Sequence, residues 1–339
     1  MNRIGKLTQK QSDIQEGAAF LGRVGLRTHN IPALTSRARL STHSRWLDHN
    51  LAATFLEEST TAFRLSSGPG FRVERFGHTA LISVRPEVNP THILADLRAW
   101  MKTAAWNPSR IFCRQLVRSP GEKDAPVILE GDPSAPPTEV VIENRLRFEV
   151  DFHCGYNPGL FCDQRANRAY LRELQPRRLL NTFAHTCTFS VAGAMVGAET
   201  TSVDISKSFL QRGRRNFELN SLPLDQHRFV AEDVPTYLRR LAKRREAFDA
   251  IILDPPTFSR GGAGKIFRVE REFAALLADA LQLALPGAAI LLSTNFSEWD
   301  ADRLAKDALR LAPAATIKKI PPPVDFSTPP RSATIWLHV

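Results

Sequence analysis

Three aspartates each follow a short apolar segment that is typical of a buried strand. Asp204 and Asp254 come directly after such segments, and Asp233 comes shortly after one. An acid at the carboxyl end of a buried strand can accept hydrogen bonds from both hydroxyls of a ribose. It can equally begin the next helix, where free backbone N–H groups favour a carboxylate. Because three such acids occur in order, we expect them to share one nucleotide-type site.

The sharpest motif is the tetrapeptide Asp254-Pro255-Pro256-Thr257. Two consecutive prolines restrict the backbone directly after a strand, so a rigid rim is expected at the edge of the sheet. The aspartate oxygen and the backbone carbonyls of this rim can hold a planar amine or the edge of a nucleobase. A plain turn can use the same residues, and this alternative stays open.

The elements that position these residues alternate between helices and short apolar strands from residue 165 onward. The pattern predicts strands at residues 178–183, 199–203, 228–230, 250–253, 288–293, 314–320 and 333–337. It predicts helices at residues 167–174, 190–197, 207–220, 235–245, 270–285 and 301–311. Strands without polar alternation that are separated by helices indicate a parallel α/β sheet, and such sheets bind ligands at the carboxyl ends of their strands.

A smaller α+β domain is predicted for residues 46–137, ahead of a larger domain at residues 138–339. In the smaller domain we expect strands at residues 62–65, 72–76, 79–84 and 111–117, a turn at 67–70 and a helix at 91–103. Residues 121–137 are rich in Gly, Pro and acids and are expected to form a loop. A hairpin with strands at 139–142 and 146–152 is expected to begin the larger domain.

The chain of 339 residues has the composition of a folded protein with a basic surplus, since 43% of its residues are hydrophobic and 24% are charged. Lys and Arg number 45 against 35 Asp and Glu, a net charge of +10, which favours nucleic acid as a partner. Residues 1–46 hold eight Lys or Arg against two acids, whereas residues 47–150 hold 12 against 13. We therefore expect residues 1–45 to form a flexible basic arm, which is a nucleic-acid-binding arm, a solvated tail or an organelle transit peptide.

The cysteines and the longest apolar runs narrow the class of protein. Cys113, Cys154, Cys162 and Cys187 form no CxxC pair, so we expect neither a disulfide framework nor a metal site. Free thiols are typical of a reducing compartment, and we predict a cytoplasmic protein. No run reaches the roughly 18 apolar residues of a membrane helix, so no membrane partner is expected.

A set of motifs in order resembles a known family; they stand at residues 163–168, 180–186, 203–207, 216–220 and 253–258. Together they look like class I S-adenosylmethionine-dependent methyltransferases of the bacterial large-subunit ribosomal RNA type. That family includes the cytosine-C5 and guanine-N7 enzymes of 23S ribosomal RNA. The resemblance covers residues 138–339 strongly and residues 64–84 weakly. It implies a Rossmann-like sheet, S-adenosylmethionine as the cofactor and 23S ribosomal RNA as a partner.

The resemblance also implies roles for individual residues. The loop 183–189 would pass under the methionine part of the cofactor, Asp204 would hold the ribose and Asp233 the adenine amino group. Asp254 and Pro255 would line the methyl-transfer site, and Gln164 and Arg165 would cap the pocket. The cofactor contacts implied in this way are Gln164, Arg165, Phe183, His185, Thr186, Phe189, Asp204, Ile205, Ser206, Asp233 and Asp254.

One departure from the family lies in the cofactor loop. Family members usually carry glycine where this chain reads Thr186-Cys187-Thr188-Phe189. Glycine permits positive φ angles and a close approach of the backbone to a ligand. Cys187 and Thr188 either narrow the pocket and weaken binding, or the loop uses ordinary backbone angles and tolerates side chains.

A second departure bears on the reaction. Cytosine-C5 methylation needs a cysteine thiolate that adds to the ring, and in that branch the cysteine follows the strand after the DPP segment. Residues 291–297 contain no cysteine here; Asn295 instead suits either a hydrogen bond to a base or amide, or a structural role. We therefore predict methylation of a nucleobase nitrogen, guanine N7-like, with Asp254, Pro255, Pro256 and Asn295 as the catalytic residues.

Two other classes of function stay open. A non-catalytic RNA-binding or ribosome-assembly protein on a degenerate methyltransferase fold would explain the replaced glycines. A protein or small-molecule methyltransferase is the other, because rims of the DPP type also hold amide nitrogens.

Overall fold

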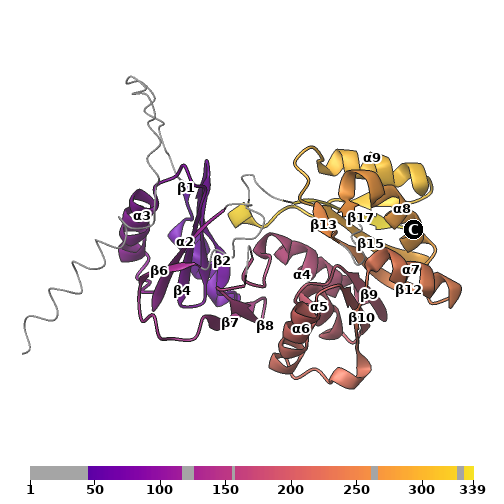
Figure 1. Cartoon of the computed structure of the whole chain (residues 1–339), viewed down its shortest axis with the longest axis horizontal. Coiled ribbons are helices and arrows are strands. Elements are labelled where there is room, and N and C mark those ends of the chain that lie inside the picture. The colour runs from indigo at the N-terminus through magenta and orange to yellow at the C-terminus, as the bar shows by residue number, and fades with distance from the viewer. Residues whose placement is uncertain (1–44, 117–125, 155–156, 261–265, 327–331) are drawn as a thin grey trace, which may run out of the picture. The chain divides into compact units, whose positions relative to one another are not determined.

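The computed structural model describes residues 45–116, 126–154, 157–260, 266–326 and 332–339 (Figure 1). The predicted basic arm, residues 1–45, lies outside these residues except for its last one. Residues 44–339 form one compact unit by their contacts. The described part of this unit contains a seven-stranded sheet, a six-stranded sheet and two separate hairpins.

The seven-stranded sheet has the order β11-β10-β9-β12-β15-β17-β16. Its parallel strands are β9 (Arg178–Thr182), β10 (Glu199–Asp204), β11 (Arg228–Ala231), β12 (Phe248–Leu253) and β15 (Ala284–Thr294). β17 (Ala333–His338) is antiparallel to β15 and to β16 (Thr316–Lys318). The predicted parallel α/β sheet is confirmed, with an antiparallel end. Because the chain turns from one side of β9 to the other between β11 and β12, the switch point of the sheet lies between β9 and β12.

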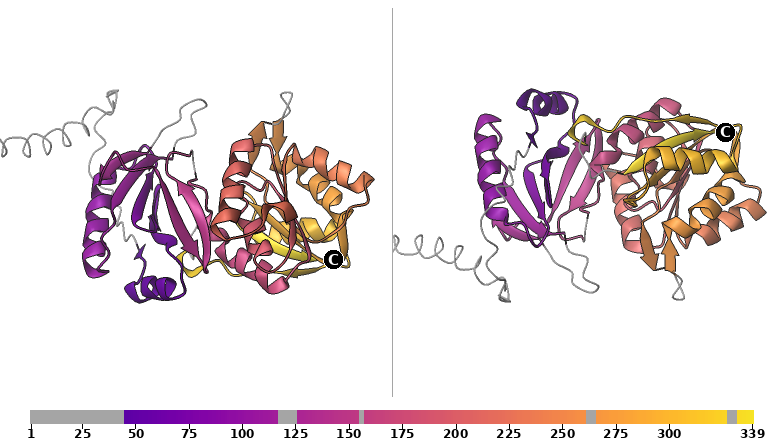
Figure 2. Two further views of the ribbon diagram at one scale, coloured as in Figure 1. Left: turned by 90° about the horizontal axis from the view of Figure 1, so that it is seen from below. Right: turned by 90° about the horizontal axis from the view of Figure 1, so that it is seen from above.

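Helices cover both faces of this sheet (Figures 1 and 2). α4 (Arg165–Leu174), α5 (Thr188–Ala194) and α6 (Lys207–Leu219) share one apolar core with Leu179 of β9. α7 (Val234–Lys243), α8 (Val269–Leu281) and α9 (Ala301–Leu311) share the other with Leu180. Neighbouring strand residues point to opposite faces, so the all-apolar strands supply both cores. None of the described helices is both long and apolar enough to cross a membrane.

The six-stranded sheet runs in chain order from β1 to β6. Its strands are β1 (Arg45–Trp46), β2 (Ala62–Gly68), β3 (Phe71–Phe76), β4 (Thr79–Val84), β5 (Arg110–Gln115) and β6 (Val127–Glu130). α3 (Pro90–Thr103) connects β4 to its parallel neighbour β5 and buries Ile93, Leu97 and Trp100. The strands at 62–65, 72–76, 79–84 and the helix at 91–103 therefore form within a few residues of their predicted positions.

Two elements of this region differ from the sequence analysis. β6 forms inside the predicted loop at 121–137, because Val127 and Ile128 pair with Cys113 and Phe112 of β5. α2 (His49–Glu57), which the sequence analysis missed, begins at Asp48, whose side chain accepts from the N–H groups of residues 50 and 51. At β6, local composition predicts a loop, and pairing with the edge of an existing sheet overrides that preference.

Two hairpins stand beside the large sheets. β7 (Thr138–Glu143) and β8 (Leu146–Asp151) form the predicted hairpin, and both of its turn residues, Asn144 and Arg145, have positive φ. That is the turn type that two-residue hairpin loops favour. The second hairpin, β13 (Phe258–Arg260) with β14 (Ile266–Arg268), follows the DPP segment and was not predicted.

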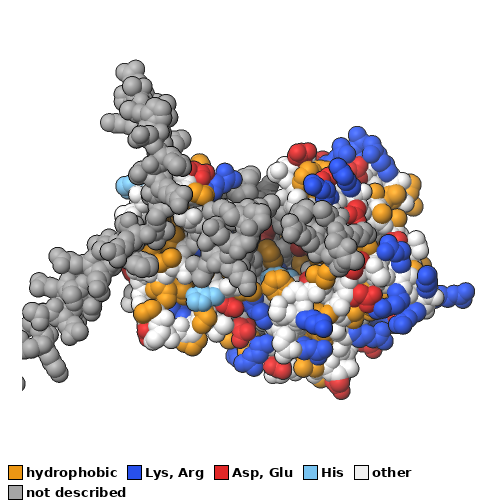
Figure 3. Space-filling view, viewed as in Figure 1, with side chains coloured by type: hydrophobic (Ala, Val, Ile, Leu, Met, Phe, Trp, Pro, Cys, Tyr) orange, Lys and Arg blue, Asp and Glu red, His pale blue; other side chains and the backbone are white. Residues whose placement is uncertain are grey.

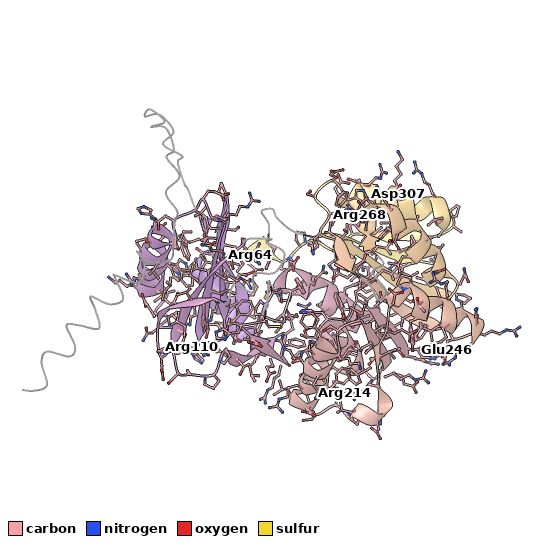
Figure 4. The ribbon with its side chains drawn as sticks, in the orientation of Figure 1. Arg64, Arg110, Arg214, Glu246, Arg268 and Asp307 are labelled. Carbon is pink, nitrogen blue, oxygen red and sulfur yellow. The ribbon has the colours of Figure 1, made fainter. Side chains whose placement is uncertain are left out.

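A buried carboxylate joins the six-stranded sheet to α4. Asp325, in the short helix Val324–Phe326, accepts the backbone N–H of Arg64 in β2 at 2.9 Å and pairs with the guanidinium of Arg165. The guanidinium of Arg64 stacks 3.8 Å from the ring centroid of Phe326, and Arg165 stacks 4.5 Å from that of Phe55. Arg64 is labelled in Figure 4. These contacts join the six-stranded sheet to α4, so both lie in the same compact unit. The domain boundary between residues 137 and 138 therefore stays a prediction.

We expect Asp325→Ala to lower the free energy of unfolding by about 3–5 kcal/mol, because it leaves a buried guanidinium without its counter-charge. Urea denaturation followed by circular dichroism measures this. Arg303→Ala is the control: it removes an exposed ion pair with Asp307 at 2.7 Å and should cost less than about 1 kcal/mol. Equal losses for the two variants would contradict the structural role of Asp325.

Candidate active site

A cavity of about 330 Å³ lies where β9, β10 and β12 end, at the switch point of the sheet. Its size is at the lower end of small-molecule sites, which span roughly 300–1,000 Å³. Most of the residues singled out from the sequence line it, namely Gln164, Phe183, His185, Phe189, Asp204, Ile205, Ser206, Asp233, Asp254, Pro255, Pro256 and Asn295. The structure thus brings together residues from six segments of the chain, while their individual roles stay predictions.

Two of the predicted residues lie elsewhere. The guanidinium of Arg165 faces Asp325 and the carbonyl of Ala62, so the structure contradicts its predicted place over the pocket. Helical geometry is the reason: Gln164 and Arg168 are four residues apart and share the side that faces the cavity, whereas Arg165 points away from it. Thr186 is also buried outside the cavity, where its hydroxyl donates to the carbonyl of Gly159.

Several lining residues were not predicted individually. They are Phe161, Arg168, Asn181, Phe209, Glu232, Val234, Ile252 and Ser332. Ala184 and Thr188 also line the cavity and lie in the loop 183–189 that was expected there. Spacing alone would have indicated Arg168, which stands one helical turn after Gln164. Ser332 carries no such signal, because it reaches the site only through the antiparallel return of β17.

The loop between β9 and α5 has an unusual backbone. Phe183, His185 and Cys187 have φ angles of 52°, 47° and 59°, all in the left-handed region. That region costs a side-chain-bearing residue roughly 1–2 kcal/mol. The alternative in which the loop uses ordinary backbone angles is therefore wrong: the loop keeps a conformation suited to glycine while carrying side chains.

Hydrogen bonds hold this loop in place. The N–H of His185 donates to Oδ2 of Asp204 at 2.8 Å, and the amide of Asn216 in α6 donates to the carbonyl of Thr186 at 2.9 Å. The N–H of Cys187 donates to the carbonyl of Ala184 at 2.7 Å. Anchors from β10 and α6 thus offset the backbone strain.

Cys187 points away from the cavity. Its side chain is buried against Gly213 of α6, where an added Cβ would lie 3.0 Å from the Cβ of Cys187 and closer still to its Sγ. Burial raises the pKa of the Cys187 thiol to about 12, so it stays protonated. Of the two residues that replace glycine, only Thr188 lines the cavity.

Asp204 and Asp233 stand in different surroundings. The carboxylate of Asp204 accepts two backbone N–H groups, from His185 on Oδ2 and from Ser206 on Oδ1, both at 2.8 Å. Burial raises its pKa, and these two hydrogen bonds oppose the shift. Each oxygen keeps a second lone pair for a ligand hydroxyl. Asp233 caps α7 through Thr236, so for this acid the helix-cap alternative also holds.

Asp254 lies at the end of β12 beside a hydrogen-bonded chain. Burial raises the pKa of Asp254 to about 6; a hydrogen bond from Ser293 and the charge of Arg168 act in the opposite direction, and the charge of Asp163 adds to the increase. Nε2 of Gln164 donates to Oγ of Ser293 at 3.0 Å. Gln164 therefore supports Asp254 through Ser293 in addition to lining the cavity.

A buried ion pair holds the guanidinium of Arg168, which lines the cavity. Nε and Nη2 of Arg168 each donate to Glu143 of β7 at 2.6 Å, and Nη2 also donates to the carbonyl of Phe161 at 2.8 Å. Arg168 is the one Lys or Arg that lines the cavity within the described ranges. The hairpin β7–β8 thus fixes the position of this guanidinium.

Basic side chains elsewhere are mostly engaged within the protein. Arg240 pairs with Glu232 at 2.6 Å, Arg212 donates to the carbonyl of Pro158 at 2.6 Å, and Arg214 stacks 4.3 Å from the ring centroid of Phe229. Figure 3 shows Lys and Arg gathered over α7 and α9, and Figure 4 places Arg214 on α6. These contacts agree with a solvated face on α6 and α7. Within the described ranges, no group of His, Cys, Asp or Glu side chains could hold a metal ion.

Residues 81–334 match the family of S-adenosylmethionine-dependent methyltransferases. The chain belongs to this family. Its relatives include ribosomal RNA large subunit methyltransferase I of Salmonella arizonae, 31% identical over 77% of this chain and 65% of that protein. Ribosomal RNA large subunit methyltransferase K/L of Legionella pneumophila is 33% identical over 50% of this chain. The chain spans about a quarter of the length of these K/L relatives, with 24% of that protein matched.

Solved structures agree with the fold. SMU.776, a methyltransferase complexed with SAH, has a TM-score of 0.73 and 25% identity over 86% of this chain and 78% of that one. A methyltransferase from Agrobacterium tumefaciens shares the fold with a TM-score of 0.64 and 20% identity, over 83% of this chain and 90% of that one. The predicted family, the Rossmann-like sheet and S-adenosylmethionine as the cofactor are confirmed.

The residues of the cavity fit this cofactor. Four acids line it, Asp204, Glu232, Asp233 and Asp254. They suit a ligand that carries a positively charged sulfonium and that donates hydrogen bonds from an ammonium group and ribose hydroxyls. Aromatic rings for the flat adenine come from Phe161, Phe183, Phe189 and Phe209. The loop that lacks the family's glycine still leaves the cavity open, because the Cys187 side chain packs on α6.

We expect Gly213→Ala to lower the free energy of unfolding by about 1–3 kcal/mol, because the new methyl group overlaps Cys187. In a Cys187→Gly background the same change should become neutral or stabilising by up to about 1 kcal/mol, since alanine favours a helix over glycine. Chemical denaturation of the four proteins measures the reversal of sign. The same loss in both backgrounds would show that Cys187 does not occupy this space.

We expect the stability of Asp254→Asn relative to the natural protein to depend on pH. The folded-state pKa of about 6 lies above the usual 3.8, so the folded protein holds this proton more tightly than the unfolded chain. This extra stability is complete below pH 3.8 and is lost as the pH rises through 6. As the pH rises from 3.8 through 6, the free energy of unfolding of Asp254→Asn should therefore increase relative to that of the natural protein by up to about 3 kcal/mol. A constant difference in melting temperature across pH 4–8 would contradict a raised pKa of Asp254 in the folded protein.

Proposed function

We propose that this protein transfers the methyl group of S-adenosylmethionine to a nucleobase nitrogen, guanine N7-like, of large-subunit ribosomal RNA. The observation that carries the choice of nitrogen is Asn295, which lines the cavity at the end of β15 where the cytosine-C5 branch has its cysteine. No cysteine lines the cavity in the part of the chain that the structure describes. Burial raises the pKa of the thiols of Cys113, Cys162 and Cys187, which makes them poor nucleophiles.

The chain's own residues then bind and orient rather than react. When bound, the cofactor supplies a methyl group that is already electrophilic, so proximity and orientation supply most of the rate. Asp204 is oriented by two N–H groups to accept ribose hydroxyls, and Pro255 and Pro256 form a rigid rim beside the base. Guanine N7 has a free lone pair and loses no proton, but its methylation leaves the ring positively charged. Asp254 is ionised at neutral pH and can stabilise that charge.

RNA as the substrate is supported by the names of the relatives and by the net charge of +10. Exposed cations at the end of α7, among them Lys243, Arg244 and Arg245, are suited to phosphate contacts. Affinity for RNA should then fall steeply with salt. An enzyme of ribosomal RNA works where ribosomes are made, and we propose the bacterial-type cytoplasm as its location.

The hypothesis of a degenerate, non-catalytic RNA-binding protein has less support than that of an active methyltransferase. The replaced glycines favoured it, yet the loop keeps its left-handed conformation and Cys187 lies outside the cavity. A protein or small-molecule methyltransferase is the remaining alternative, and the nature of the labelled product distinguishes it.

We expect the protein to bind S-adenosylmethionine in calorimetry and Asp204→Ala to abolish binding, because this carboxylate lines the cavity and is held there by two backbone N–H groups. Asp225→Ala, an exposed acid outside the cavity, is the control. Labelled methyl groups should enter ribosomal RNA from cells that lack this gene, and mass spectrometry of the nucleosides identifies the modified base. Absence of binding at millimolar ligand would refute the proposal, and a ribonuclease-resistant product would indicate a protein substrate.

A further inference from the structure

One hydroxyl group that lines the cavity lies between two side-chain oxygens. Oγ of Ser332 is 2.8 Å from Oδ2 of Asp163 and 2.7 Å from Oδ1 of Asn295. The three residues come from the turn before α4, the end of β15 and the start of β17. Ser332 and Asn295 line the cavity together with Asp254.

The number of available protons decides which hydrogen bonds form among Ser332, Asp163 and Asn295. A serine hydroxyl has a single proton and can donate to one acceptor only. The carboxylate of Asp163 is the stronger acceptor, because a hydrogen bond to an ionised oxygen is roughly twice as strong as one to a neutral oxygen. Two oxygens 2.7 Å apart without a proton between them would repel each other, so the amide of Asn295 must turn its Nδ2 toward Ser332. The two ends of an amide have the same shape, and hydrogen bonding is what distinguishes them.

This arrangement gives Asn295 a defined polarity. With Nδ2 donating to Ser332, its carbonyl oxygen is left for the cavity as a hydrogen-bond acceptor. Guanine carries acceptors, N7 and O6, on one edge and N–H donors, at N1 and N2, on the other. An acceptor in the protein can therefore hold only the donor edge, which leaves N7 free for the methyl group.

We propose that Asp163 and Ser332 hold Asn295 as an acceptor for the N1–H or N2–H donors of the target guanine. Asn295 is then a specificity residue that contacts the substrate, and Ser332 and Asp163 are positioning residues. The inference rests on the proposed function, since it specifies how that site selects its base.

The first experiment measures kcat and KM for ribosomal RNA from cells that lack this gene, together with the Kd of S-adenosylmethionine. Asn295→Ala should raise KM about tenfold, with kcat and the cofactor Kd within about threefold of the natural protein. Ser332→Ala should raise KM less, about threefold to fivefold, and Ser332→Thr should restore it because the hydroxyl is retained. Ser134→Ala is the matched control, since Ser134 donates to Asp132 at 2.7 Å in the same way but outside the cavity.

The double variant tests whether Ser332 acts through Asn295. If it does, Ser332→Ala should have no further effect on KM in the Asn295→Ala background. Additive effects, or a cofactor Kd that rises as much as KM, would overturn the positioning role.

The second experiment tests the polarity of the contact. Two RNA substrates carry inosine, which lacks the 2-amino group, or N1-methylguanosine at the modified position. The natural protein should lose about tenfold in kcat/KM on at least one of them, and Asn295→Ala should lose less than twofold on that same substrate. Use of both analogues as readily as of guanosine by the natural protein would overturn this inference alone. No methylation of natural RNA would overturn the proposed function and this inference with it.

Discussion

The hydrogen bond from the N–H of His185 to Asp204 is the contact on which the geometry of the site depends. It connects the loop after β9 to the end of β10, the two strands whose carboxyl ends form the floor of the cavity. Phe183, His185 and Cys187 of this loop all have left-handed φ values, and the bond helps to hold the loop in that conformation. Asn216 and Gly213 of α6 complete the support, one by a hydrogen bond and the other by leaving room for Cys187.

Buried ion pairs connect the six-stranded sheet and the hairpin β7–β8 to this site. Glu143 at the end of β7 holds Arg168 at the cavity, and Asp325 connects Arg165 of α4 to β2. Buried charges gain little net stability over apolar packing, but breaking one partner is costly, so they favour one arrangement over others. The six-stranded sheet therefore contributes to the orientation of α4. Arg168 reaches the cavity from this helix, and Gln164 reaches it from the residue before the helix.

The three aspartates noticed first in the sequence have separate tasks because their surroundings differ. Asp204 is fixed by two backbone N–H groups, and Asp233 serves as the cap of α7. Asp254 is half-buried near Ser293 and Arg168, and desolvation raises its pKa to about 6. Residue type and position after a strand are the same in each case; the hydrogen-bond donors and charged neighbours around each carboxylate distinguish them.

The sequence by itself determined the order of the strands and helices of the seven-stranded sheet, the edge of that sheet that carries the site, and the family, because these depend on local periodicity and on motifs short enough to read directly. Tertiary structure alone decided which side of α4 faces the cavity, how a loop without glycine keeps left-handed angles, and that β6 forms where composition predicts a loop. It also brought Ser332 beside Asn295 and Asp163. Such contacts join residues up to 169 positions apart, and hydrogen bonds over that separation leave no local pattern in the chain.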